Sequence, residues 1–428
     1  MNSKYSFLVV ISLLAGLTSC GTKISSSSPA SSNSSSNEIS SSEKVSSSTT
    51  TSSSPKNPVP DSKPFTIDST MLDQTNTDTL GLSKITNAKT VHVFEASDDT
   101  NHYLNGVLTT SFKGKFYCQW QSSIKDEDAI DTYVAYATSA DGETWNAPTT
   151  LVPTIEDGYC SSGGWLSTDN LLIAYINVWK SATSPRGGNA YYIESTDGST
   201  WSAMKPVLMK DGTAMNGIIE QDPHVLTNGR IINSAHFQPG LFVNPIYTDD
   251  STGRGGWVKA TYTNMTIKEG DTNSREMEPS EFVNSDGDII MTFRDQNSTF
   301  YRLASISRDN GATWSQTILT DMPDCRQKQS AGNLPDGTAY LVGAPVNNKL
   351  RIPLCITLSK DGKNFNKSYV LRTNTEIPAL KYTGKAKRLG YHYPKSVVIG
   401  NNLYVSYATN KEHADITIIP LSTISLNS

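Results

Sequence analysis

Ser139-Ala-Asp-Gly-Glu-Thr-Trp145 is the first of several related phrases that decide the fold of this 428-residue chain. Three later stretches repeat its pattern of serine, aspartate, glycine and a final aromatic residue: Ser195-Thr-Asp-Gly-Ser-Thr-Trp201, Ser307-Arg-Asp-Asn-Gly-Ala-Thr-Trp314 and Ser359-Lys-Asp-Gly-Lys-Asn-Phe365. A weaker version, Thr248-Asp-Asp-Ser-Thr-Gly253, precedes Trp257. The five aromatic residues follow one another at intervals of 56, 56, 57 and 51 residues, so the chain is built from repeats.

Each phrase suits a tight hairpin turn and is an Asp box. The aspartate carboxylate can accept N–H groups of the turn, and glycine supplies the positive φ that such a turn needs. The aromatic side chain anchors the turn in the layer between neighbouring sheets. We therefore expect Trp145, Trp201, Trp257, Trp314 and Phe365 to pack at the outer turns of successive sheets.

A repeat of this length is typical of a β-propeller, in which each repeat forms one four-stranded blade. Four strand-like runs lie between the first two boxes, at residues 149–152, 163–167, 171–179 and 190–195. Three more follow the last box, at 393–399, 402–407 and 416–420. Because Val91–Glu95 can supply their missing fourth strand, we predict an all-β fold with six blades. A five-bladed propeller is the alternative if that segment does not pair.

The first 64 residues predict export and anchoring. Lys4, the apolar run 7–17 and Cys20 are typical of a bacterial lipoprotein signal peptide spanning residues 1–19, with Cys20 as the lipid acceptor. The run is too short to span a bilayer. Residues 20–64 include a serine-rich stretch with almost nothing apolar to bury, which predicts a disordered linker. We expect residues 65–428 to form the propeller, held at the cell surface by the lipid anchor alone.

Composition limits the partners of this domain. The formal net charge is −5 and no basic run occurs, which argues against nucleic acid as a partner. We expect a monomer. The remaining cysteines have no metal-binding spacing, so we expect buried apolar side chains at Cys118, Cys160, Cys325 and Cys355.

Three further segments resemble the sialidase (neuraminidase) superfamily, whose members carry these boxes as BNR repeats. In Glu278-Pro-Ser-Glu-Phe-Val-Asn-Ser-Asp-Gly-Asp-Ile-Ile-Met-Thr-Phe-Arg294, an acidic residue opens an inner strand and an arginine closes the next one. Arg351 precedes the last box, where sialidases have a further arginine. Gly390-Tyr-His-Tyr-Pro-Lys-Ser-Val-Val-Ile-Gly400 is similar to the segment with the catalytic tyrosine.

The resemblance implies a glycoside hydrolase that acts on terminal, acidic sugars of glycans. Tyr393 would be the nucleophile and Glu278 its base, because a tyrosine avoids the repulsion between a sugar carboxylate and a carboxylate nucleophile. Arg294 and Arg351 would bind the sugar carboxylate through paired hydrogen bonds. Tyr391 would be a further substrate contact, and no cofactor is expected.

Two parts of the sialidase pattern lack a clear counterpart. Sialidases place an arginine in the opening blade, whereas this chain has none before Arg186. The sequence therefore leaves open whether the substrate is sialic acid, a uronic acid or another sugar. The acid that protonates the leaving group has four candidates, Asp98, Asp99, Asp128 and Asp131, of which we take Asp131.

A second group of residues leads to a different hypothesis. Gln221-Asp-Pro-His224 opens the third blade with the same proline offset as Glu278-Pro279, and His236 ends the following strand. Asp222, His224 and His236 could meet in the cavity as a divalent-metal site or an acid–base group, or only bind strand ends. The chain would then be a metal-dependent carbohydrate deacetylase or lyase. A non-catalytic glycan-binding lipoprotein is the third possibility.

Other residues could also reach the cavity. Trp179 and two further tryptophans, Trp120 and Trp165, are candidates for stacking on a sugar, although packing between blades is expected for at least two of the three. Lys411 and Glu412, at the presumed rim, are interpreted as an exposed ion pair.

Overall fold

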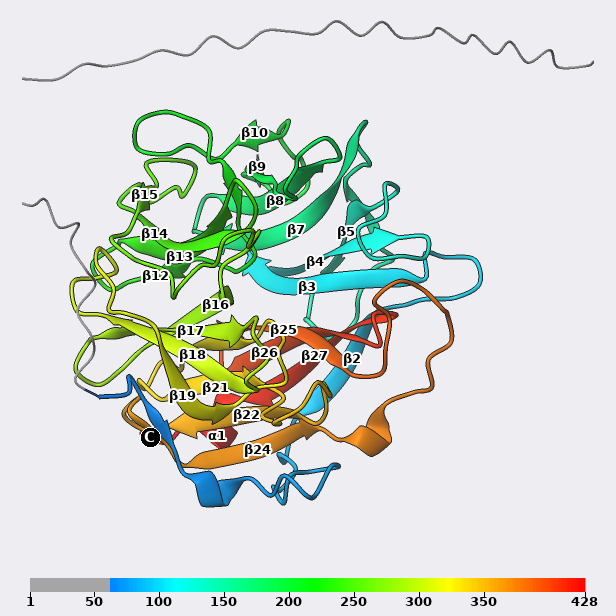
Figure 1. Ribbon diagram of the computed structural model, residues 1–428. Coiled ribbons are helices and arrows are strands. Elements are labelled where there is room, and N and C mark those ends of the chain that lie inside the picture. The colour runs from blue at the N-terminus through cyan, green and yellow to red at the C-terminus, as the bar shows by residue number, and fades with distance from the viewer. Residues whose placement is uncertain (1–61, 428) are drawn as a thin grey trace, which may run out of the picture. The chain divides into compact units, whose positions relative to one another are not determined.

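The computed structural model describes residues 62–427, and these residues form an all-β propeller of six blades (Figure 1). The six sheets stand around one axis, and the strands within each blade are antiparallel. The prediction of six blades is confirmed, and the five-bladed alternative is wrong. The expected signal peptide, Cys20 and nearly all of the serine-rich linker lie outside the described residues.

Blades one to three are consecutive segments of the chain. Blade one contains β3 (Tyr103–Phe112), β4 (Lys115–Ser123), β5 (Tyr133–Ser139) and β6 (Thr149–Val152). Blade two contains β7 (Gly158–Ser167), β8 (Leu172–Lys180), β9 (Asn189–Ser195) and β10 (Lys205–Pro206). Blade three contains a divided inner strand, β11 (Gly217–Ile218) and β12 (His224–Val225), then β13 (Ile231–Phe237), β14 (Phe242–Thr248) and β15 (Val258–Lys259).

Blades four to six continue this order. Blade four contains β16 (Glu276–Val283), β17 (Ile289–Asp295), β18 (Tyr301–Ser307) and β19 (Ile318–Pro323). Blade five contains β20 (Ser330–Asn333), β21 (Ala339–Gly343), β22 (Leu354–Ser359) and β24 (Lys367–Arg372). Blade six contains β25 (Tyr391–Ile399), β26 (Asn402–Thr409), β27 (His413–Pro420) and β2 (Lys89–Glu95). The remaining elements are β1 (Thr66–Ile67), β23 (Asn364–Phe365), two 3-10 turns at Ser69–Met71 and Asn374–Glu376, and α1 (Leu421–Ile424).

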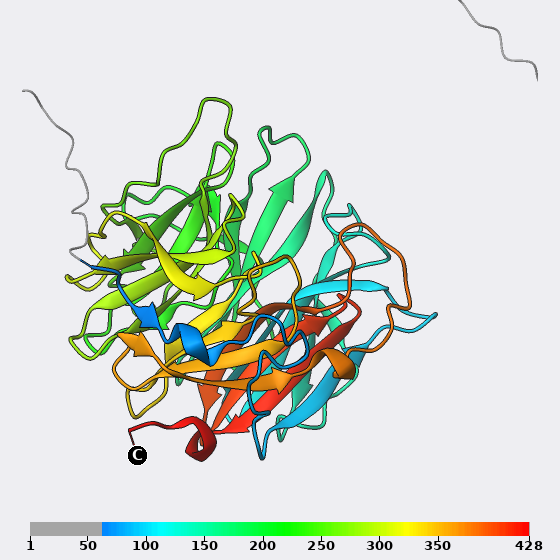
Figure 2. The same cartoon turned by 60° about the horizontal axis from the view of Figure 1, so that its bottom comes forward.

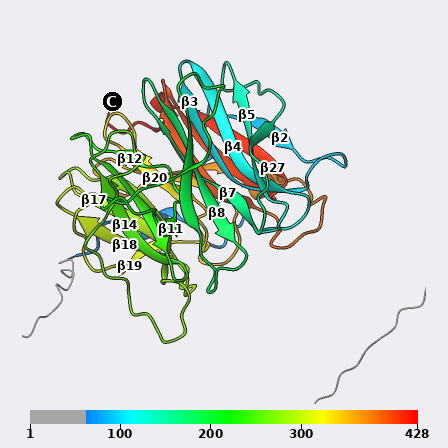
Figure 3. The same ribbon diagram turned by 90° about the horizontal axis from the view of Figure 1, so that it is seen from above.

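The ring is closed by the N-terminal strand β2. It pairs with β27, with Val91 opposite Ile416 and His92 opposite Asp415. Figure 3 shows the two strands side by side, although 323 residues separate His92 from Asp415. The expectation that Val91–Glu95 supplies the missing strand is therefore confirmed. The segment before it (blue in Figure 2) lies along blade five, where β1 pairs with β23.

The Asp boxes form turns between the third and fourth strands of their blades. In the first box, the Asp141 carboxylate accepts the N–H groups of Glu143 and Thr144 at 2.8 and 2.7 Å. The Ser139 hydroxyl accepts the N–H of Gly142 at 2.9 Å, and Gly142 has a φ of 76°. The roles predicted for aspartate and glycine are confirmed.

The weak box before Trp257 keeps this chemistry. Asp250 accepts the Thr252 N–H at 2.9 Å, while the Thr248 hydroxyl accepts the Asp250 N–H at 3.0 Å. Thr248 and Asp250 thus replace the serine and aspartate of the other boxes. Gly253, with a φ of 65°, replaces the glycine.

The aromatic residues of the boxes differ in burial. Trp257, Trp314 and Phe365 are at most 1% exposed, whereas Trp145 and Trp201 are only partly buried. All five pack against buried residues of their own or the adjoining blade, as predicted. The uneven burial means that the boxes do not contribute equally to stability.

The core consists of apolar layers between neighbouring blades. The cysteines at 118, 160, 325 and 355 are buried in it and unpaired, as expected. Between residues 62 and 427, no helix is long and apolar enough to cross a bilayer.

Candidate active site

The inner strands surround a cavity of about 370 Å³ at one end of the propeller axis. This volume is in the range of small-molecule sites. Its walls carry acidic, basic and phenolic side chains from five blades and the loops between them. The charged and phenolic residues are Glu127, Asp128, Tyr159, Arg186, Glu220, Glu278, Arg294, Lys328 and Tyr393.

Two β-bulges turn Glu278 and Tyr393 into this cavity. The register of β16 shifts between Met277 and Ser280, and that of β25 shifts between His392 and Lys395. Glu278 and Tyr393 are the first residues of these bulges, with left-handed φ values of 50° and 51°. Such a backbone costs about 1–3 kcal/mol at a residue other than glycine, and it is concentrated at functional sites.

Blade one has the same bulge with a glycine. Its register shifts between Asn105 and Leu108, and Gly106, with a φ of 63°, occupies the position of Glu278 and Tyr393. A Cβ at Gly106 would lie 2.6 Å from the Ser162 hydroxyl. Blade one therefore contributes no side chain from this position.

Glu278 is held by Arg294, as the 16-residue phrase suggested. The Arg294 Nη1 donates to Glu278 Oε2 at 2.9 Å, and both side chains are at most 15% exposed. Burial disfavours the Glu278 carboxylate, but the charges of Arg294 and Lys328 outweigh it and hold the pKa of Glu278 below its usual value. Glu278 is therefore an anion at neutral pH.

Tyr393 is surrounded by cations. Arg351 lies over its ring at 4.6 Å from the centroid, and Lys411 and Lys328 lie at 5.4 and 5.6 Å. Arg351 Nη2 approaches the Tyr393 hydroxyl to 3.5 Å. Burial raises the pKa of Tyr393, but the charges of Arg351 and Lys411 outweigh burial and lower that pKa below its ordinary value. This environment favours the phenolate, which is the nucleophilic form.

No direct hydrogen bond joins Tyr393 to Glu278 among the described residues, and the role of Glu278 as the base for Tyr393 stays a prediction. Both residues line the same cavity, but Glu278 uses Oε2 for Arg294. Its other oxygen has no hydrogen bond among the described residues. Glu278 Oε1 is thus the atom that could accept the Tyr393 proton.

His236 holds the backbone of Glu278, and it belongs to no group of described residues that could bind a metal ion. Its Nε2 accepts the backbone N–H of Glu278 at 3.1 Å, so the ring proton is on Nδ1, which faces Glu220 at 3.9 Å. Burial lowers the pKa of His236, which keeps the ring neutral. His236 and Arg294 hold similar places in their blades, because they pair with Ile218 and Met277 of the adjacent inner strands.

Asp131, the predicted general acid, is placed elsewhere. Its carboxylate accepts the N–H of Ile124 at 2.7 Å and so holds the loop between β4 and β5. Two other carboxylates of this loop, Glu127 and Asp128, line the cavity instead. The prediction of Asp131 is wrong because a loop has no strand register from which its inward residue can be read.

Glu127 and Asp128 have different surroundings. Glu127 Oε1 accepts bonds from Tyr103, Asn105 and Lys411, at 2.8, 3.3 and 2.7 Å. Burial opposes its ionisation, but Lys411 and these donors outweigh burial and lower the pKa of Glu127. Asp128 uses only Oδ1 in hydrogen bonds and leaves Oδ2 without a partner among the described residues. Asp128 therefore keeps one carboxylate oxygen available for a ligand.

Arg186 is a cation of this site that strand patterns did not indicate. It comes from the loop between β8 and β9 and lies 4.3 Å from the Trp179 ring centroid. One nitrogen donates to Asp128 at 2.9 Å and to the Tyr159 hydroxyl at 2.6 Å. The first arginine of the chain thus reaches the cavity from blade two.

Tyr391, Asp222 and His224 do not belong to this site. Tyr391 is fully buried, and its hydroxyl donates to the Thr373 carbonyl oxygen at 2.8 Å, because the bulge at Tyr393 breaks the alternation that would otherwise place both tyrosines on one face. Asp222 and His224 line another cavity farther along the axis. Between residues 62 and 427, no group of three His, Cys, Asp or Glu side chains could hold a metal ion, so the predicted metal site is wrong.

Two smaller predictions are also resolved. Trp179 lines the cavity, while Trp120 and Trp165 pack between blades, as expected for two of the three. Lys411 and Glu412 are 2% and 0% exposed and bind Glu127 and Lys387, so the exposed ion pair is wrong.

Comparison with protein-family models shows the family to which the chain belongs. The family model described as a BNR repeat-like domain matches residues 114–405, which is more than half of the chain. The chain belongs to the BNR repeat-like family. A search of curated proteins finds no match.

Several solved structures are similar to this BNR-repeat propeller in fold. A protein of unknown function from Dyadobacter fermentans is similar, with 16% identity, a TM-score of 0.61, and coverage of 78% of this chain and all of that one. The Hadza microbial sialidase Hz136 shares 14% identity at a TM-score of 0.61, covering 78% of this chain and 69% of that one. The NanB sialidase from Streptococcus pneumoniae shares 13% identity at 0.56, covering 78% and 71%. These likenesses establish a sialidase-like fold.

Several cavity residues of this BNR-repeat protein were missed, for different reasons. Glu220 stands between the two pieces of the divided inner strand of blade three, Lys328 stands just before β20, and the two form an ion pair at 3.4 Å. The rule that such positions surround the axis could have found them. Arg186 lies on a loop, where no periodic pattern indicates which way a side chain points; for the same reason Asp131 was chosen over Asp128, which was also a candidate.

Proposed function

We propose that this protein is a glycoside hydrolase that cleaves terminal acidic sugars from glycans with Tyr393 as its nucleophile. The observation that carries the proposal is the pair of matching bulges that turn Glu278 and Tyr393 into one cavity in a left-handed backbone. A fold gains nothing from such conformations by themselves, and both residue types have a role in glycoside cleavage by tyrosine.

The geometry supports a two-step reaction. Tyr393 Oη attacks the anomeric carbon and its proton passes to Glu278, while Asp128 donates a proton to the leaving oxygen as the glycosidic bond breaks. Asp128 then takes a proton from a water molecule that attacks the same carbon. This second attack breaks the bond to Tyr393, which recovers its proton from Glu278.

The charges around the cavity support an acidic sugar. Arg186, Arg294 and Lys328 line it, and Arg351 lies behind Tyr393. The planar guanidinium groups can bind a carboxylate in pairs of hydrogen bonds. Arg186 and Gly106 line the same cavity, so Arg186 supplies a cation there although the bulge of blade one carries no side chain.

An aryl glycoside screen with matched variants tests this function. The wild type should release aryl alcohol from at least one sialoside or glucuronide, and more slowly from the corresponding neutral glycosides. Tyr393→Phe removes only an oxygen, so it should fold normally and lose more than about a thousandfold in kcat. Full activity of Tyr393→Phe, or no turnover of any acidic glycoside, would overturn the proposal.

Arg294 tests the acidic specificity separately. Arg294→Lys keeps the charge beside Glu278 but loses the planar fork, so the preference for a glucuronide over the matching glucoside should fall by about 10-fold or more. An unchanged preference would assign the sugar carboxylate to other residues. The readout is the ratio of the two kcat/KM values.

We also propose that a lipid on Cys20 holds this enzyme at the outer surface of a bacterial cell. The support is the order of features in residues 1–20, which is a basic residue, then an apolar run, then a cysteine. Fractionation of cells that express Cys20→Ala should find the protein released from membranes with its glycosidase activity intact. Continued membrane association would contradict the proposal.

A further inference from the structure

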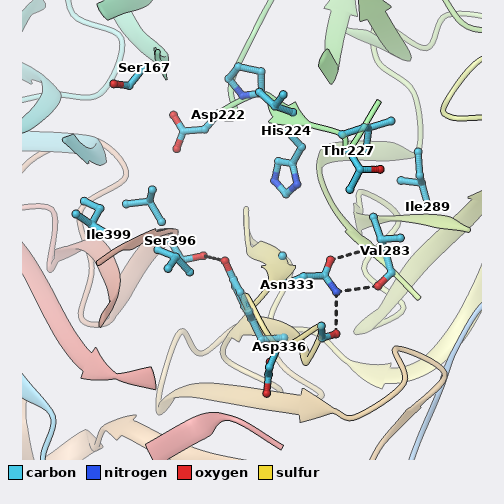
Figure 4. A pocket seen from close by; sticks show the side chains of 18 of the residues that line it. Ser167, Asp222, His224, Thr227, Val283, Ile289, Asn333, Asp336, Ser396 and Ile399 are labelled. Carbon is cyan, nitrogen blue, oxygen red and sulfur yellow. Dashed lines mark hydrogen bonds between the residues drawn. The ribbon is translucent and has the colours of Figure 1, made fainter. Parts of the chain in front are cut away.

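A second cavity, with a volume of about 1040 Å³, lies farther along the propeller axis than the candidate active site and is shown from close by in Figure 4. We call it the distal cavity. Each blade contributes residues from its inner strand or the adjoining turn: 109–111, 165–167, 222–227, 283–285, 332–337 and 396–399. None of its lining residues lines the candidate active site.

Strand β3 shows how far apart the two cavities are. Asn105 lines the candidate active site, and Thr109 lines the distal cavity. Four residues of a strand span roughly 13 Å. Lys395 is buried between the two: its ammonium donates to the Glu220 carbonyl oxygen at 2.8 Å and also bonds to the Gln221 side chain. The cavities are therefore separate binding volumes.

Several polar atoms of the distal cavity are not used by the fold. Asp222 accepts the Trp165 N–H with Oδ1 at 2.6 Å, and its other oxygen has no partner among the described residues. Within the same residues, the His224 ring makes no hydrogen bond, and the Thr109 hydroxyl is buried without a partner. Figure 4 shows Asp222 and His224 directed into the open volume. Asp222 and His224 are partly exposed and Thr109 is buried, and unused donors and acceptors that converge on one cavity point to a ligand that supplies their partners.

The charge of the distal cavity differs from that of the candidate active site. Of its described lining residues only Lys360, which is exposed, is basic, whereas Asp222 and Asp336 are acidic. Burial lowers the pKa of His224 to about 4, so its ring is neutral at neutral pH and can both donate and accept a hydrogen bond. Anionic sugars are disfavoured here, because Asp222 and Asp336 would repel them, Lys360 is exposed, and Lys395 is buried behind the wall with its ammonium bonded to Glu220 and Gln221.

The rest of the wall combines hydroxyl groups with apolar side chains. Thr110, Ser111 and Thr227 line it beside Val283 and Ile399. Sugars present hydroxyl groups at their edges and C–H groups on their faces, so a wall of this kind matches both. We propose that the distal cavity is a second binding site, which takes a neutral saccharide and holds it through Asp222 and His224.

Histidine spectra test this proposal site by site. The chain has six histidines, so a protein labelled with ¹⁵N only in histidine gives few ring signals, and His224→Gln identifies that of His224. Adding glucose, galactose, N-acetylglucosamine or lactose should shift the His224 signals with at least one of them. The same sugar should leave the signals of His236 and His392, beside the candidate active site, unchanged.

Two controls complete the experiment. Glucuronic acid should not shift His224, and Tyr393→Phe should bind the neutral sugar as the wild type does. Asp222→Asn and His224→Gln should each weaken that binding at least tenfold, measured by titration, without changing the aryl glycosidase rate. If none of the four sugars shifts His224 at millimolar concentration, or if His224→Gln binds as tightly as the wild type, the proposal fails. Failure here leaves the glycosidase test untouched, because the two readouts use different residues.

Discussion

His392 and Tyr393 are neighbours in β25, and both depend on Arg351. Arg351 Nη1 donates to His392 Nδ1 at 2.9 Å, so the ring proton of His392 is on Nε2, which donates to the Arg388 carbonyl oxygen at 2.9 Å. Burial and the charge of Arg351 lower the pKa of His392 well below its usual value. A neutral His392 holds the guanidinium in place beside Tyr393.

This arrangement predicts a pH dependence of stability. The pKa of His392 is depressed in the folded protein, so below pH 6.5 the unfolded chain takes up a proton that the folded chain does not. The wild type should therefore lose stability relative to His392→Gln as the pH falls from 7 to 5, by up to about 1.4 kcal/mol per pH unit. Urea unfolding of both proteins at several pH values measures this; a constant difference would show that His392 is protonated in the fold.

At the residue scale, local sequence patterns identified the residues on strands but not those on loops. The sialidase-like phrases pointed to Glu278 and Tyr393, and both line the cavity, each preceding a proline at a bulge. Asp131 failed because the turn before β5 points Asp128 inward. Tyr391 failed because it is two residues from Tyr393 across a bulge, which reverses the usual alternation.

At the scale of elements, the boxes set the blade turns and contribute unequally to stability. Trp314 is 1% exposed and Trp145 is only partly buried, although both end a complete box. Trp314→Ala should cost about 3–5 kcal/mol of unfolding free energy. Trp145→Ala should cost clearly less, because it removes less buried area. Equal losses in urea unfolding would mean that the turn, and not the buried ring, determines the stability.

The divided inner strand of blade three explains why Asp222 was misplaced. Between its two pieces, the Ile219 N–H donates to Asn177 Oδ1 at 3.0 Å, and the Gln221 carbonyl oxygen accepts from Asn233 at 3.0 Å. These side chains replace ladder hydrogen bonds over a stretch that the proline offset did not reveal. Asp222 is therefore shifted along the axis relative to Glu278, into the distal cavity.

For the whole molecule, the decisive contact is the closure of blade six. Val91 of β2 is 7% exposed and packs with Trp120 of blade one and Ile416 of β27. Val91→Asn would bury an amide without a partner and should cost about 1–3 kcal/mol. Because the strand joins both ends of the ring, thermal unfolding should stay a single transition at lower temperature. Lys89→Asn, at the exposed start of the same strand, removes only a surface ion pair with Glu143 and is the control, with an expected change within about 0.5 kcal/mol.

The repeat interval predicted this closed ring, because every blade must hide two faces against its neighbours. It did not predict which chemistry the two ends of the axis carry. The chemistry at each end depends on which side chains the bulges and loops direct into the cavity. The direction of those side chains does not follow a periodic pattern in the sequence.

The proposed glycosidase mechanism depends most on the covalent bond between Tyr393 and the sugar. A fluorinated glycosyl fluoride of the best acidic substrate slows release of the sugar from the enzyme, so the intermediate accumulates and its mass can be measured. If Tyr393 is the nucleophile, the wild type should carry one added sugar per protein, and peptide mapping should locate it on Tyr393. Tyr393→Phe should carry none. A sugar found on Glu278 or another residue, or steady turnover by Tyr393→Phe, would contradict this mechanism.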